Sequence, residues 1–149
     1  MRQRQPGGEV CAGAGSPHAA IGDRFDGDQL GDDPVTAWAR ASAAAREAFA
    51  APGALRRSVE LSYGRRPAEG YCHEMTMDLT VHAWDLARAI GADEQLDEEL
   101  VSDVLAFIEP QVDQLVATGL FAPPVEVGDD ADMQTRLLAL LGRRAQPSP

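Results

Sequence analysis

The segment from Tyr71 to Arg88 holds the side chains of this sequence that are most capable of chemistry. A helix advances by about 100° per residue, so Asp78 and His82 project from the same side on adjacent turns. A carboxylate oxygen and an imidazole nitrogen in this arrangement are a common donor pair for a divalent ion such as Zn, Ni, Fe or Mn. A plain hydrogen bond between the two side chains, at a wet seam between helices, is the simpler explanation, because Asp-x-x-x-His arises often by chance. The residues alone therefore leave a metal site and a structural pair both open.

The same segment is apolar on two sides when it is drawn as a helix. His82 falls in the middle of one apolar stripe and Asp78 at its edge, which predicts that both project toward the core. The apolar members of that stripe are Met75, Leu79, Leu86 and Ala89. Trp84 falls on the other side with Met77 and Val81, which predicts a core residue on an inner helix that the following helix covers. An unpaired buried carboxylate is costly, so Asp78 needs a partner in this arrangement.

Other reactive side chains in the segment favour structural interpretations. Glu74 could join a carboxylate cluster with Asp78, but its place near the helix start suits interaction with the helix dipole. Cys72 has no paired base nearby in the sequence that would activate a thiol. Asp85 and Arg88 are three residues apart, which predicts a surface ion pair. The sequence assigns no catalytic residue.

Helices must position these side chains. Asp33-Pro34 is a typical start for a helix that runs to about residue 51. A second helix is expected from about residue 67 to residue 90, where Gly91 ends it. Residues 57–63 alternate polar and apolar types, which predicts a short extended connector. Arginine pairs at 56–57 and 65–66 flank it and could hold a ligand carboxylate, or they are simply solvated charge.

Two further helices complete the expected fold. The third runs from about residue 96 to residue 118, with a kink at Pro110. Gly119 ends it, and Leu120 is expected to pack back onto the helix as the apolar partner of this cap. The last begins after Asp129-Asp130. Its apolar face consists of Met133, Leu137, Leu140 and Leu141. Helices joined by short links predict an all-α protein, an antiparallel bundle or a close relative.

Composition limits the classes of function. The chain has 149 residues and a formal net charge of −11, and all its basic residues are arginine. This charge argues against nucleic acid as a partner, and no run of about 18 apolar residues predicts a membrane span. Two cysteines are too few for a disulfide scaffold, so a cytoplasmic protein is expected. We expect a flexible or divergent segment at 1–30, a helical-bundle domain at 31–143 and a disordered tail at 144–149.

The string from His82 to Ala87, His-Ala-Trp-Asp-Leu-Ala, is the most specific part of a resemblance to a known family. With Gly31-Asp32-Asp33-Pro34 and the stretches at 107–113 and 119–124, it resembles actinobacterial DinB-like metal-binding proteins. These proteins are related to the N-terminal domain of mycothiol-dependent maleylpyruvate isomerase. The likeness covers roughly residues 30–143.

The resemblance implies a DinB-like antiparallel bundle that holds one divalent metal ion, with Asp78 and His82 as two of its three ligands. The third family ligand is a His on an N-terminal helix that should precede residue 30, and no matching His is found there. The chain thus resembles a family member that is incomplete at its N-terminus. His18, Glu74 or a second chain would have to supply the third donor.

The function implied by the resemblance is metal binding that supports thiol-dependent transfer or isomerisation, with a small-molecule ligand or low-molecular-weight thiol as partner. The alternatives are a non-catalytic helical module that self-associates, for example as a homodimer, and a truncated family member without a complete metal site. An apolar stripe that lacks a covering helix favours self-association.

Overall fold

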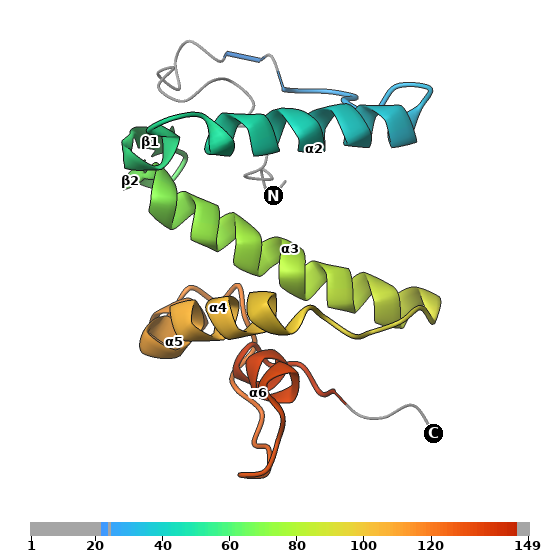
Figure 1. Ribbon diagram of the computed structural model, residues 1–149, viewed down its shortest axis with the longest axis vertical. Coiled ribbons are helices and arrows are strands. Elements are labelled where there is room, and N and C mark those ends of the chain that lie inside the picture. Colours follow the sequence, from blue (N-terminus) through green and yellow to red (C-terminus); the bar gives the residue numbers. More distant parts are fainter. Residues whose placement is uncertain (1–21, 24, 146–149) are drawn as a thin grey trace. The chain divides into compact units, whose positions relative to one another are not determined.

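The computed structural model describes residues 22–23 and 25–145, which are mostly helical (Figure 1). These residues divide into two compact units, one ending at Met75 and the other beginning at Thr76. The long helix α3 (Ala68–Ile90) contains this boundary, so each unit is considered by itself. No helix among the described residues has the length and the apolar run that crossing a membrane requires. Most of the segment predicted to be flexible, and the end of the predicted tail, lie outside the described residues.

Helix α2 (Pro34–Ala50) begins where the sequence predicts. The side chain of Asp33 accepts a hydrogen bond from the backbone N–H of Thr36 at 3.0 Å, and Pro34 occupies the first turn, where its missing N–H costs nothing. The four-residue β-strands β1 (Ser58–Leu61) and β2 (Gly64–Pro67) follow and pair antiparallel. The predicted connector at 57–63 therefore contains one strand of a hairpin, and the other strand, β2, was not predicted.

The hairpin forms because two local features suit it. Gly64 has a φ of +118°, a conformation that a side chain would oppose, and so permits the tight reversal after Leu61. Glu60 lies opposite Arg65 in the register, and their side chains form an ion pair across the strands. All four residues of β2 are exposed, so this strand carries no alternation of apolar residues that would reveal it in the sequence.

Helix α3 ends as predicted at Gly91, whose φ is +67°, and the N–H of Ala92 donates to the carbonyl of Ala87 at 2.8 Å. The third predicted helix is divided at Pro110 into α4 (Glu98–Ile108), the 3-10 turn η4 (Glu109–Gln111) and α5 (Val112–Ala117). The break is the predicted effect of a proline that has no N–H to donate.

The segment after α5 departs from the prediction in one contact. Gly119 ends the helix with a φ of +72°, as expected, but Leu120 is exposed instead of packing back. Phe121 packs against the core in its place. Helix α6 (Met133–Leu140) then begins at its cap, Asp132, whose side chain accepts from the N–H of Thr135 at 2.7 Å.

The core of the second unit lies between α3, α4 and α6. Its buried members come from one side of α3, from α4 and from the end of α6. They are Met77, Val81, Val101, Val104, Leu105, Ile108, Leu137 and Leu141. Trp84 is also buried, as predicted. The side chain of Gln134, in α6, binds the loop that precedes α4. It donates a hydrogen bond to the carbonyl of Glu94 and accepts one from the N–H of Leu96, both at 2.9 Å.

Candidate metal site on helix α3

Asp78 and His82 lie together on α3, as their spacing predicts. The Nε2 atom of His82 is 3.4 Å from the Oδ1 atom of Asp78. The side chain of His82 is 61% exposed and that of Asp78 is 45% exposed, so this part of the helix is open to water. A carboxylate oxygen and an imidazole nitrogen thus face each other at the surface of the second unit.

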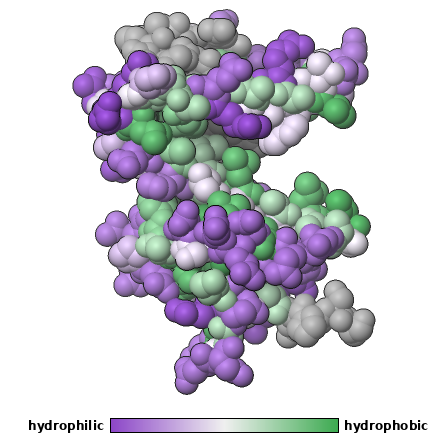
Figure 2. Space-filling view, viewed as in Figure 1, coloured by the Kyte–Doolittle hydropathy of each residue, from purple (hydrophilic) through white to green (hydrophobic). Residues whose placement is uncertain are grey.

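The predicted orientation of this pair toward the core is wrong. Leu79, Leu86 and Ile90 surround His82 along the helix and are exposed, the last two at 61% and 68%. The core-facing side of α3 is the opposite one, because Met77 and Val81 pack in one cluster with residues of α4 and α6, and Trp84 on the same side is buried. Figure 2 shows apolar side chains at the surface near the C-terminal end of α3. The site is therefore a surface site in an apolar stripe and not an interior pocket.

Asp85 is a third member of this group of side chains, although the sequence predicted an ion pair between Asp85 and Arg88 instead. Its Oδ2 atom is 3.1 Å from Nδ1 of His82, so the imidazole lies between two carboxylates. Arg143 holds Asp85 with two hydrogen bonds, Nε to Oδ1 at 3.1 Å and Nη2 to Oδ2 at 2.8 Å. The hydrogen bonds from Arg143, with a smaller contribution from His82, keep the pKa of Asp85 below its ordinary value despite partial burial.

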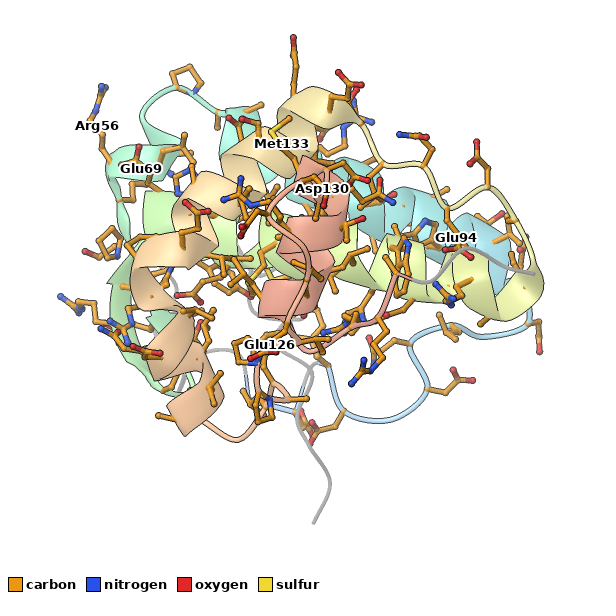
Figure 3. All side chains as sticks on the ribbon, turned by 90° about the horizontal axis from the view of Figure 1, so that it is seen from below. Arg56, Glu69, Glu94, Glu126, Asp130 and Met133 are labelled. Carbon is orange, nitrogen blue, oxygen red and sulfur yellow. The ribbon has the colours of Figure 1, made fainter. Side chains whose placement is uncertain are left out.

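The predicted partner of Asp85, Arg88, has other contacts. Its guanidinium forms an ion pair with the carboxylate of Glu94 at 3.2 Å. Glu94 lies in the loop after α3 and is labelled in Figure 3. The same guanidinium lies over the ring of Trp84, 5.0 Å from the ring centroid. The spacing of three between His82 and Asp85 could have revealed their contact. No local signal points to Arg143, which is 58 residues away.

This arrangement can do two different things chemically. If Nδ1 carries the proton and donates it to Asp85, Nε2 keeps a lone pair next to the carboxylate of Asp78 and can bind a metal ion. If both ring nitrogens are protonated, the imidazolium bridges two carboxylates and no lone pair remains. The group that occupies Nε2 of His82, a metal ion or a proton, therefore separates the metal site from the structural pair.

The described residues supply too few donors for a closed site. Among residues 22–23 and 25–145, no group of three or more His, Cys, Asp or Glu side chains could hold a metal ion. His18, one predicted source of a third ligand, lies outside the described residues. Glu74, another, accepts a hydrogen bond from the hydroxyl of Tyr63. Desolvation, with a further contribution from Glu74, raises the pKa of Tyr63.

The remaining candidates of the sequence analysis lie in the first unit. Arg65 is paired with Glu60, and Arg66 lies over the ring of Tyr63, 5.8 Å from its centroid. Figure 3 shows Arg56 pointing away from the ribbon. Cys72 is half-buried in α3. These arginines are thus placed as surface charge and ring contacts, and none of these contacts identifies a ligand.

The chain is similar to two uncharacterised proteins, from two strains of Mycobacterium tuberculosis. Each is 41% identical over 75 residues, which is 50% of this chain and 41% of the relative. The match therefore spans about two fifths of the length of these curated relatives. No protein-family model matches the chain. No solved structure matches it either.

Proposed function

We propose that this chain is a helical domain that binds a divalent metal ion through Asp78 and His82, with further donors that the described part of a single chain does not supply. The observation that carries the proposal is the position of His82, whose Nδ1 faces Asp85 and whose Nε2 faces Asp78. A histidine that binds a metal commonly donates its other ring N–H to a carboxylate, which fixes both tautomer and ring orientation. Arg143 holds that carboxylate in place.

The donor set indicates the class of metal. One imidazole nitrogen and one carboxylate oxygen suit Zn, Ni, Fe or Mn better than Ca or Mg, which prefer oxygen donors only. A bound ion of this class would lower the pKa of a water or thiol on it. The family resemblance names a low-molecular-weight thiol as the ligand and a DinB-like bundle as the architecture. The helical fold and the buried Trp84 of the His-Ala-Trp-Asp-Leu-Ala string are compatible with that architecture.

Calorimetric titration with zinc chloride, on protein without a polyhistidine tag, tests the proposal. We expect saturable binding that His82→Ala and Asp78→Asn abolish. Asp85→Asn should weaken binding about 10- to 100-fold, the usual effect of a group that orients a ligand. The matched controls are His73→Ala, another histidine of α3, and Asp103→Asn, an exposed acid of α4, which should bind like the wild type. Zinc binding that is absent, or that survives His82→Ala unchanged, contradicts the proposal.

The two ring nitrogens of His82 provide a second, independent test. Nitrogen NMR during a titration with zinc chloride should show the metal on Nε2 of His82 and a proton on Nδ1. Ring nitrogen signals of His82 that zinc leaves unchanged would favour the structural pair.

A second candidate function is a non-catalytic helical module that associates without metal. The exposed leucines and Ile90 on α3 favour it, because contiguous exposed apolar side chains commonly mark interaction sites. Sedimentation velocity of metal-free protein at several concentrations tests this candidate. A species that remains monomeric in the presence of a chelator contradicts it.

A further inference from the structure

We infer that a second copy of this chain completes the metal site, so that two Asp78 and two His82 side chains hold one ion between two α3 helices. This inference rests on the proposed function, because it identifies the partner of the same site. It adds that the ion and the apolar stripe act together, and that association depends on metal.

The number of donors is the first argument. Zinc in structural sites is bound by four ligands in a tetrahedral arrangement. In the described part of one chain, Asp78 and Asp85 both contact His82. Arg143 already holds Asp85, so Asp78 and the Nε2 atom of His82 are the two donors that we assign to the ion. A two-fold axis brings the same patch of two molecules together and therefore doubles every donor on it. Two copies supply two nitrogens and two oxygens, which is a complete set.

The apolar surroundings of the donors are the second argument. Leu79, His82, Leu86 and Ile90 are spaced by three, four and four residues, so they form one stripe along α3. This spacing is typical of the seam between two paired helices. His82 lies inside the stripe, with exposed apolar side chains one turn before it and after it. A second α3 that packed on these side chains would bring its own His82 and Asp78 to the same seam.

Charge is the third argument, and it explains why the ion is needed. The chain has a formal net charge of −11, and each copy brings the carboxylate of Asp78 to the seam. Two such carboxylates repel each other unless a cation lies between them. Asp85 adds less to this repulsion because Arg143 neutralises it. The leucines favour contact while the carboxylates oppose it, so a divalent ion decides whether the copies associate.

A second copy fits this surface better than a different partner does. Asp78, His82 and the apolar side chains lie on one side of α3, and a two-fold contact needs no partner other than this chain. A donor from residues 1–21, such as His18, would instead give one ion per chain in a monomer, and the stoichiometry of binding separates the two arrangements.

The test measures mass and stoichiometry on the same tag-free protein. Light scattering after size exclusion should give a monomer in a chelator and a dimer with zinc chloride. Calorimetry should give half an ion per chain. His82→Ala and Asp78→Asn should abolish both responses, while His73→Ala and Asp103→Asn should retain both. Circular dichroism confirms that each variant keeps its helices.

A matched pair of variants tests whether the apolar stripe on α3 contributes to the dimer. Leu86→Asp places a charge in the stripe and should prevent the dimer at zinc concentrations that dimerise the wild type. Leu120→Asp changes a leucine that is at least as exposed and lies outside α3, so it should dimerise normally.

Each other outcome has a distinct meaning. One ion per chain in a monomer overturns this inference and leaves the proposed function intact. A dimer that forms equally in a chelator also overturns it, since the ion is then unnecessary. No zinc binding at all overturns the proposed function and this inference together. Aggregation that His82→Ala does not prevent overturns the inference as well, because the ion then acts elsewhere.

Discussion

The two sides of α3 differ in what they contact, although both are apolar enough to be a core. Met77, Val81 and Trp84 are buried within the second unit, while Leu79 and Leu86 remain exposed beside His82. Both sides have the periodicity of a buried helix face. The first side therefore serves stability, and the second is available for binding. Substitutions on each side can test this division of α3.

Truncating one residue on each side should give the sharpest contrast. Trp84→Ala should lower the free energy of unfolding by about 3–5 kcal/mol, because it removes a large side chain that is only 3% exposed. Leu86→Ala, two residues along the helix, should change it by less than about 0.5 kcal/mol, because that side chain is exposed. Urea unfolding followed by circular dichroism, in a chelator, measures both. Equal losses for the two variants would contradict the division.

Asp85, which contacts His82 on α3, is also held by Arg143 near the C-terminal end of the described residues. Asp85→Asn should lower the stability of the second unit by about 1–2 kcal/mol, because it weakens two charge-assisted hydrogen bonds of a half-buried pair. The same urea unfolding measures this loss. Asp78→Asn is the matched control, since Asp78 is more exposed and its replacement should change the free energy of unfolding little. If Asp78→Asn cost as much as Asp85→Asn, the side with His82 would also contribute to folding.

Conservative replacement of Trp84 should cost much less than its truncation. Within the described part of the chain, the buried Nε1 atom of Trp84 has no hydrogen-bond acceptor. Trp84→Phe removes this unpaired donor, and an aromatic ring remains under the guanidinium of Arg88. The gain from removing the donor offsets part of the lost packing, so we expect a loss of about 1 kcal/mol. A loss as large as that of Trp84→Ala would mean that the donor has a partner in solution.

The sequence predicts the helices well because their ends carry local signals. Asp33 and Pro34 begin α2, Gly91 ends α3, and Pro110 breaks the helix that it enters, all through backbone chemistry within a few residues. The strand β2 carries no such signal, because its four residues are all exposed. Leu120 was expected to pack back onto the helix that Gly119 ends, but it is exposed, and the next residue, Phe121, packs against the core.

The candidate site was only half predictable for a related reason. The spacing of Asp78 and His82 places them together on any helix, so their contact followed from the sequence. Which of two apolar sides becomes the core depends on where α4 and α6 pack, and periodicity contains no such information. Arg143 reaches Asp85 across 58 residues, and only the folded chain shows that contact.

The smallest expected effect on stability is that of His82→Ala in the absence of metal. The imidazole is exposed, and its contacts with Asp78 and Asp85 are surface contacts of the kind that contribute about 0–1 kcal/mol. Asp85 also keeps both hydrogen bonds from Arg143 in this variant. Urea unfolding in a chelator should therefore barely change, while zinc should stabilise the wild type and leave the variant unaffected, because only the wild type binds the ion. A large loss in the chelator would instead make His82 a structural residue, since its side chain would then contribute to folding without any metal.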